Sequence, residues 1–109
     1  MTTHPTIQMS LCDVKARYDL IDPEVIHGMA LCYTDGSLKY GDFNWMEVPE
    51  SKYIAAYQRH MRDYHRGVHF AEDSGLLHVD HAITNLAILR SMLATDPVIA
   101  RAMAEGVYK

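Results

Sequence analysis

The sequence lacks the features that would place it in several specialised classes of protein. Its two cysteines, Cys12 and Cys32, have neither the spacing of a metal-ligand pair nor the number needed for a disulfide framework. No apolar run approaches the roughly 18 residues of a membrane span, and residues 1–9 lack the basic region and apolar run of a signal peptide. We therefore expect free thiols, a cytoplasmic location and no membrane partner.

An excess of positive charge is also absent. The formal net charge is −4 at pH 7, whereas proteins that bind nucleic acids carry a basic face that neutralises phosphates. We therefore expect no polymeric nucleic acid as partner, although a local cationic pocket would suit a small anionic ligand. Hydrophobic residues make up 49% of the 109 residues, which is enough for a single domain, residues 1–109, with a modest core. We expect self-association to complete that core.

The spacing of apolar residues predicts four helices, and no segment alternates with the period of a strand. Asp22-Pro23-Glu24 has the N-cap, the first-turn proline and the acidic first turn of a helix start. Glycines are expected to end three of the helices. The helices are predicted from Pro23 to Tyr40, from Pro49 or Ser51 to Gly67, from about Leu76 to Leu93, and from Pro97, capped by Thr95-Asp96, to Gly106. With a loose arm at residues 1–11, the fold class is an all-α four-helix bundle.

Polar residues form a stripe on the otherwise apolar third helix. His78, His81 and Asn85 are spaced i, i+3 and i+7, which places them on one face. Burying such groups without partners costs about 1–3 kcal/mol each. We expect the stripe to line a pocket together with Arg59 and His60 of the second helix. The alternative is a set of core side chains that are satisfied by the backbone or by each other.

A transition-metal site is another interpretation of the histidines. The pattern His-x-x-His on the third helix, with a third ligand from His60 or Asp63, has the right residue types, but alone it is a weak signal. Asp73 is expected either to cap the third helix or to bind a metal. Ser74, followed by Gly75, is expected to be a helix cap and not a nucleophile.

Positive charge and aromatic rings occur in the same region. Arginine suits bidentate contact with phosphate and lysine acts as a point charge, so Arg59, expected to point inward, and Lys39 are candidate phosphate ligands. Arg62 and Arg66 are expected on the solvated surface. Trp45 could stack on a base.

Several motifs together resemble the opening of phage dATP/dGTP diphosphohydrolase-like domains, over roughly residues 15–93. The family is grouped with the all-α, MazG-like nucleotide pyrophosphatases. The matching segments are Tyr18-Asp19-Leu20-Ile21-Asp22-Pro23-Glu24, Lys39-Tyr40-Gly41-Asp42-Phe43-Asn44-Trp45, Arg59-His60, Asp73-Ser74-Gly75-Leu76, His78, His81-Ala82 and Asn85.

The resemblance implies that dATP or dGTP is cleaved to the monophosphate and pyrophosphate, with Mg²⁺ or Mn²⁺, by a homo-oligomeric helical bundle. Together with the histidine cluster, it implies three sets of site residues. The catalytic set is His60, His81 and Asp73, the ligand-binding set is Lys39, Asn44, Trp45, Arg59, His78 and Asn85, and the metal-binding set is Asp63 and Asp73.

The sequence departs from that family in its carboxylates. MazG-like enzymes hold Mg²⁺ with Glu-Glu-x-x-Glu on one helix and Glu-x-x-Asp on the next, whereas the second helix here offers only Glu50 and Asp63. A site that is rich in His, Arg and aromatic residues suits gripping a nucleotide more than activating water. The alternative function is therefore a phage protein that sequesters a nucleotide-derived immune signal of the host, without cofactor or cleavage. A helical oligomer with no ligand is a third possibility.

Overall fold

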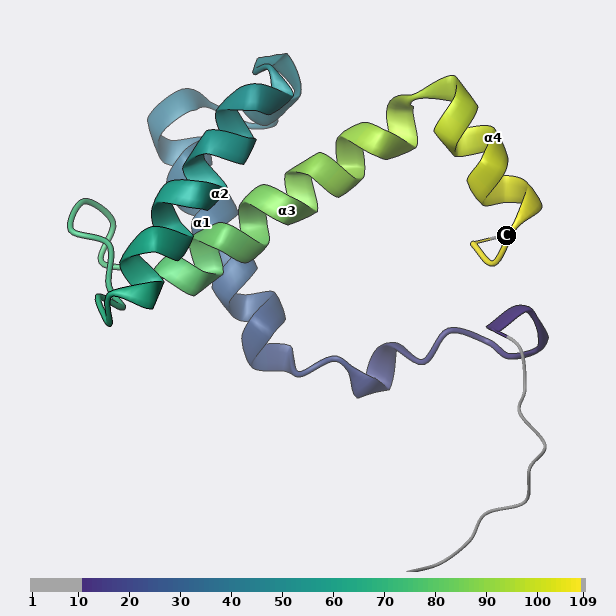
Figure 1. The fold of residues 1–109 in the computed structure, drawn as a ribbon, viewed down its shortest axis with the longest axis horizontal. Coiled ribbons are helices and arrows are strands. Elements are labelled where there is room, and N and C mark those ends of the chain that lie inside the picture. The colour runs from purple at the N-terminus through teal and green to yellow at the C-terminus, as the bar shows by residue number, and fades with distance from the viewer. Residues whose placement is uncertain (1–10, 109) are drawn as a thin grey trace, which may run out of the picture.

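The computed structural model of the chain describes residues 11–108 (Figure 1). This part of the chain is helical and contains no strand, so the all-α prediction is confirmed. The α-helices are α1 (Pro23–Tyr40), α2 (Glu50–His65), α3 (His78–Thr95) and α4 (Pro97–Glu105), and the short 3-10 helices are η1 (Leu11–Asp13), η2 (Tyr18–Leu20) and η3 (Asn44–Glu47). Except for Leu11, the arm predicted at residues 1–11 lies outside the described residues.

Local capping chemistry bounds α1 and α4 as the sequence predicts. Asp22 Oδ1 accepts a hydrogen bond of 2.9 Å from the backbone N–H of Glu24, which satisfies a donor that the first turn leaves free. Asp96 caps α4 in the same way, accepting from the N–H of Val98 at 2.9 Å. Gly41 ends α1 with a φ of 97°, a left-handed conformation that glycine adopts without a steric cost.

The start of α3 differs from the prediction. Helix α3 begins at His78 and not at Leu76, and Leu77 stands at the N-cap without a side-chain cap, so the prediction that Ser74 caps this helix is wrong. The preceding loop holds its last residues extended, because the N–H of Ala71 donates to the carbonyl of Leu76 at 2.8 Å. The N–H of His78 likewise donates to the His69 carbonyl at 2.7 Å. Ser74 Oγ instead accepts from the N–H of Leu76 at 3.1 Å, inside the loop.

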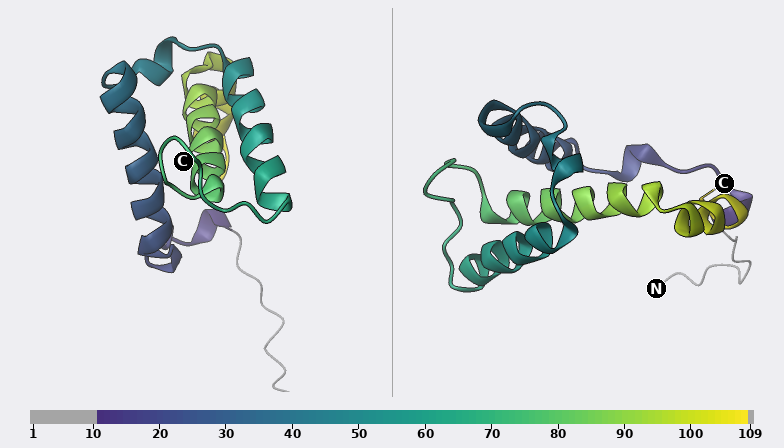
Figure 2. Two further views of the ribbon diagram at one scale, coloured as in Figure 1. Left: turned by 90° about the vertical axis from the view of Figure 1, so that its left-hand side faces the viewer. Right: turned by 90° about the horizontal axis from the view of Figure 1, so that it is seen from above.

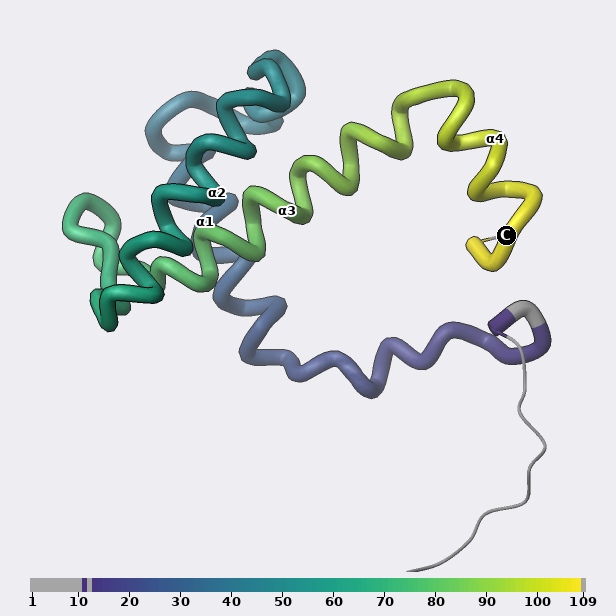
Figure 3. Tube along the Cα trace, in the orientation of Figure 1, coloured from purple at the N-terminus to yellow at the C-terminus, as the bar shows by residue number. Residues whose placement is uncertain are grey.

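Helix α3 is the central element of the fold. Helices α1 and α2 pack against it from two sides, as the left view of Figure 2 shows, and α4 packs on its far end (Figure 1). The chain trace in Figure 3 shows that η3 connects α1 to α2 at one end of α2 and that the loop at residues 66–77 connects α2 to α3 at the other. The first half of α3 is therefore surrounded more completely than the second half.

The core is small and lies along the first half and the middle of α3. Its buried apolar residues, among the described ones, are Cys32, Ala71, Ala82 and Ile88. Cys32 is a free thiol, as the sequence predicts. The apolar run at residues 86–89 of α3 is not buried on all sides, since Leu86 is 48% exposed.

Helices α1 and α3 approach closely at Gly28. A Cβ atom at this position would lie 2.5 Å from the carboxyl carbon of Asp80, so the absence of a side chain lets the Asp80 carboxylate rest against α1. Gly36, the other glycine within α1, makes no such close contact, because no atom lies within 4 Å of a Cβ built there. None of the helices in the described range is long and apolar enough to cross a membrane.

Candidate functional site

A cavity of about 780 Å³ lies between the second half of α1, η3, the start of α2 and the middle of α3. Pockets for small molecules and cofactors typically have volumes of about 300–1,000 Å³. Four of the site residues predicted from the sequence line this cavity, and they come from two separate segments of the chain. They are Asn44, Trp45, His81 and Asn85.

Aromatic side chains supply much of the apolar lining. Trp45 and Tyr53 are both half-buried in the wall, and the Tyr53 hydroxyl donates to the backbone carbonyl of Trp45 at 3.2 Å. Burial raises the pKa of Tyr53 and of Tyr33, so both phenols remain protonated at neutral pH. A planar, neutral ligand such as a nucleobase can stack on rings of this kind.

One face of α3 forms the opposite wall. His81, Thr84, Asn85 and Ile88 follow the helical spacing i, i+3, i+4 and i+7, so all four point toward the same cavity. The Thr84 hydroxyl is engaged, since it donates to the Asp80 carbonyl at 2.8 Å. Asn85 is 9% exposed, and its carboxamide has no hydrogen bond to any residue that the structure describes.

Three of the predicted histidines form a connected cluster behind this wall. The rings of His60 and His81 are stacked, with centroids 4.6 Å apart and planes 9° apart. His60 Nδ1 lies 2.8 Å from His78 Nδ1, so one of the two donates a hydrogen bond to the other. His78 is buried and its Nε2 lies 3.5 Å from Asp63 Oδ2, while His81 Nε2 lies 2.8 Å from Ser74 Oγ.

Burial disfavours the charged form of His60 and of His81. Burial, reinforced by the proximity of His81 and His78, lowers the pKa of His60 from 6.5 to about 4. Burial also lowers the pKa of His81. Because neutral imidazole has a free lone pair on one ring nitrogen, each of these side chains can accept a hydrogen bond at pH 7. Of the two, only His81 lines the cavity, so His60 can act on a ligand only through His81.

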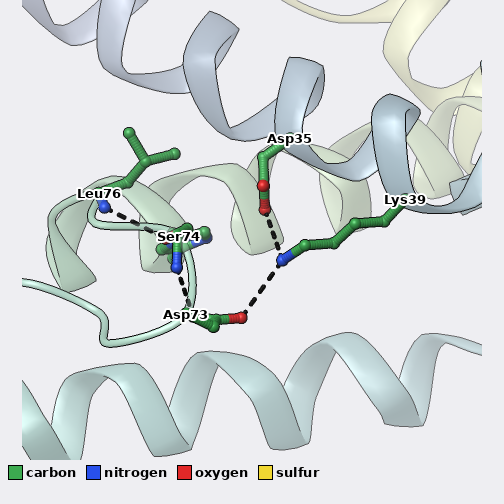
Figure 4. Close-up of polar contacts among 6 residues, drawn as sticks. Asp35, Lys39, Asp73, Ser74 and Leu76 are labelled. Atoms are coloured by element: carbon green, nitrogen blue, oxygen red, sulfur yellow. Dashed lines mark hydrogen bonds and ion pairs between the residues drawn. The ribbon is translucent and has the colours of Figure 1, made fainter.

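An ion-pair bridge ties the loop before α3 to α1 (Figure 4). Lys39 Nζ lies 3.0 Å from Asp35 Oδ2 and 3.3 Å from Asp73 Oδ2. Hydrogen bonds to the two carboxylates raise the pKa of Lys39, and the same contact lowers the pKa of Asp73. Asp73 Oδ1 also accepts from the N–H of Ser74 at 2.9 Å, so Asp73 stabilises the loop and does not cap α3.

The remaining predicted residues do not converge on the cavity. Arg59, expected to point inward beside His60, is exposed on α2, because the inward side of that turn is taken by His60 itself. Asp63 contacts His78, whereas Asp73 contacts Lys39, so the two predicted metal ligands belong to different clusters.

The resemblance implies a divalent metal, which requires several ligand side chains that converge on one point. Among residues 11–108, no group of three or more His, Cys, Asp or Glu side chains is arranged to hold a metal ion. The Lys39 ammonium already lies between Asp35 and Asp73, where it offsets the negative charge of both carboxylates. The described residues of one protomer therefore do not fit the implied metal, and they supply no ligand set for either the Mg²⁺ site or the zinc interpretation.

Sequence reasoning missed other charged residues at the cavity. Asp35 and Asp42 from the end of α1 and the following turn, and Lys52 from the first turn of α2, all line it. Asp35 precedes Lys39 by four residues, a spacing that places both on one helix face, so this pair was detectable from the sequence. Lys52 was not, because nothing local shows which side of α2 faces α1.

Comparison with known proteins identifies the family. The chain is 29% identical over 83 residues to a curated protein of Salmonella phage PMBT28 named dATP/dGTP diphosphohydrolase; the match covers 76% of this chain and 29% of that protein. The chain thus spans less than a third of the length of this relative. No solved structure matches the chain. Residues 9–102 match the family described as dATP/dGTP diphosphohydrolase, N-terminal, and the chain belongs to that family.

Proposed function

We propose that this chain binds a purine deoxynucleoside triphosphate in the cavity between α1, η3, α2 and α3, and that it hydrolyses the ligand to the monophosphate and pyrophosphate. The observation that carries the proposal is the cavity itself. It has the volume of a small-molecule site, an aromatic wall that includes Trp45, and an opposite wall with His81 and Asn85. The relative named dATP/dGTP diphosphohydrolase supplies the class of ligand.

The polyphosphate is expected to lie toward Lys39 and the cavity rim. The lining contains one ammonium group, Lys52, but two carboxylates, Asp35 and Asp42, so the interior repels an anion of high charge. Lys39 stands beside the cavity on α1, and its side chain is 38% exposed. A phosphate oxygen that contacts the ammonium would compete with Asp73 for it.

His81 is the group best placed to assist hydrolysis. In this reaction a water oxygen attacks the α-phosphorus, the bond to the bridging oxygen breaks, and pyrophosphate leaves while the water loses a proton. The neutral imidazole of His81 can accept that proton, and Ser74 and His60 hold the ring between them. Lys39 offsets charge on the phosphates. We assign His60 a positioning role, because it contacts His81 and does not line the cavity.

Binding without cleavage is the second candidate function, and one observation favours it. No carboxylate cluster for a divalent metal occurs in the described protomer, whereas the aromatic and amide groups of a binding site are present. Such a protein would sequester a nucleotide or a nucleotide-derived signal.

One experiment separates the two functions. The protein is incubated with each of the four deoxynucleoside triphosphates, with and without Mn²⁺, and free, bound and cleaved species are resolved by chromatography. Monophosphate and pyrophosphate from dATP and dGTP support hydrolysis, and His81→Gln should then abolish turnover while the exposed-histidine control His27→Gln retains it. Full recovery of intact ligand after heat denaturation supports sequestration. If no nucleotide is retained or cleaved, the proposed function is wrong.

We also propose that the active form is a homo-oligomer. The buried apolar core of the described protomer is small, and no large side chain in it is fully buried. Apolar residues such as Leu31, Leu86 and Leu93 are exposed on α1 and α3, which a second copy could cover. Light scattering at several concentrations tests this, and a monomer at all of them would contradict it.

A further inference from the structure

The carboxamide of Asn85 is the least explained polar group of the cavity. Asn85 lies in the middle of α3 and is 9% exposed, so it is more than nine-tenths buried. No hydrogen bond joins its side chain to any described residue, so its amide is left with hydrogen-bonding capacity that the protomer does not use. No contact within the described protomer therefore explains why an amide stands at this position.

The Asn85 amide faces the cavity. Among the described residues that are not exposed, no side-chain nitrogen or oxygen that is completely enclosed lacks a partner. The unpartnered amide of Asn85 must therefore keep some accessible surface, and the space that its residue lines is the cavity. Its neighbour Thr84 cannot take the same role equally well, because its hydroxyl already donates to Asp80.

We propose that Asn85 reads the substituent at the 6-position of a purine base, and that its freedom to turn over lets one site accept both adenine and guanine. This inference rests on the proposed function and specifies the selectivity of the same cavity. A carboxamide offers one acceptor oxygen and one donor nitrogen on the same plane. Because no protein group fixes which of the two faces the ligand, rotation of the amide by half a turn exchanges them.

The two purines require opposite partners at this position. The 6-amino group of adenine donates, so it pairs with the amide oxygen. The 6-oxo group of guanine accepts, so it pairs with the amide nitrogen after the amide has turned. An asparagine held by the protein in one orientation would favour one of the two bases, as a fixed donor or acceptor does. Pyrimidines lack the imidazole ring of purines and reach less far from the sugar.

Asn44 is the other amide at the cavity, and it is less suited to this role. It lies in the first turn of the short helix η3 and is half-buried, whereas Asn85 is held within a helix of 18 residues that packs against α1 and α2. A base-reading group needs a fixed position, which elements of this kind provide better than short turns.

Two variants and four ligands test the inference by equilibrium binding. Asn85→Leu keeps the approximate volume and removes both hydrogen-bonding groups, and Asn85→Asp keeps the shape but leaves only acceptors. The ligands are the deoxynucleoside triphosphates of adenine, guanine and hypoxanthine, together with that of unsubstituted purine, which has hydrogen at position 6. Gln58→Leu, which removes an exposed amide from α2, is the matched control.

The inference predicts a pattern across these ligands. Asn85→Leu weakens the binding of the three 6-substituted purine nucleotides about tenfold. It weakens the binding of the unsubstituted purine nucleotide clearly less, because only the first three lose a contact at position 6. Asn85→Asp raises the ratio of adenine to guanine affinity by about tenfold or more, since a carboxylate accepts from an amino group and repels an oxo group. Gln58→Leu changes neither the four affinities nor the ratio of adenine to guanine affinity.

The outcomes separate this inference from the proposed function. If the wild-type protein binds no purine nucleotide, the proposed function fails and the inference fails with it. If the wild type binds but Asn85→Leu weakens all four ligands equally, or none of them, the function stands and the role of Asn85 is overturned. Asn85→Asp, being isosteric, provides the decisive ratio if Asn85→Leu does not fold.

Discussion

Acid sensitivity of the fold at His60 is the prediction that follows most directly from the histidine cluster. The pKa of His60 is lowered from 6.5 to about 4 by burial and by its neighbours His81 and His78. Between these two values the unfolded chain binds a proton that the folded chain does not bind, so the free energy of unfolding decreases as the pH falls from 6.5 toward 4. Above pH 6.5 the histidine is neutral in both states and exerts no such effect.

The expected size of this loss follows from the pKa shift. A difference of one pKa unit corresponds to about 1.4 kcal/mol, so the full shift would amount to about 3 kcal/mol. His60 is only half-buried, and solvent screening reduces the expected loss to about 1–2 kcal/mol. The carboxylates with lowered pKa values, such as Asp73, lose their stabilising effect only nearer to or below pH 3.8, so the window above pH 4 reports mainly on histidine.

Urea unfolding followed by circular dichroism at several pH values measures this loss. His60→Gln retains an amide that can hydrogen-bond to His78 but cannot be protonated in this range, so its free energy of unfolding should fall less steeply between pH 6.5 and 4. His81, whose pKa is also lowered, accounts for the slope that remains. The control is His27→Gln on the exposed side of α1. Equal slopes for the wild type and His60→Gln would refute the reasoning.

Two further predictions concern packing and capping, and thermal or urea unfolding measures both. Gly28→Ala should destabilise the protein by up to about 1 kcal/mol, because the new Cβ would lie 2.5 Å from the Asp80 carboxyl carbon and the end of that side chain has to turn away. In an Asp80→Ala background, Gly28→Ala should instead stabilise the protein by up to about 1 kcal/mol, because alanine has the higher helix propensity. Destabilisation in both backgrounds would show that the contact with Asp80 is not the cause. Asp96→Ala should cost about 1 kcal/mol by removing the cap of α4, and an unchanged midpoint would argue against that cap.

Local features of the sequence were sufficient to predict most helix boundaries. The hydrogen bond from Glu24 to Asp22 joins residues two apart, and the one from Val98 to Asp96 does likewise, so short motifs contain all the information needed. The start of α3 was mispredicted because the hydrogen bond from His78 to His69 keeps the preceding backbone extended. That contact depends on how the loop folds back, which no capping motif shows.

The composition of the site was only partly predictable. The sequence groups His78, His81 and Asn85 as one polar stripe; His81 and Asn85 line the cavity, whereas His78 contacts α2. Seven residues of helix rise about 10 Å, so His78 and Asn85 have different neighbours although they share a face. The contact between Lys39 and Asp73 joins residues 34 apart in the chain and becomes visible only in the folded structure.

The lone tryptophan offers the most direct test of the central claim, that the cavity is a purine nucleotide site. Trp45 lines this cavity and is the single tryptophan of the chain, so its fluorescence reports on ligand bound there and nowhere else. Titration with dATP or dGTP should give a saturable change in emission, and dCTP and dTTP should give a much weaker one. Two results would contradict the account. One is that the protein retains dATP in equilibrium dialysis while the emission of Trp45 stays unchanged, and the other is that it retains no dATP.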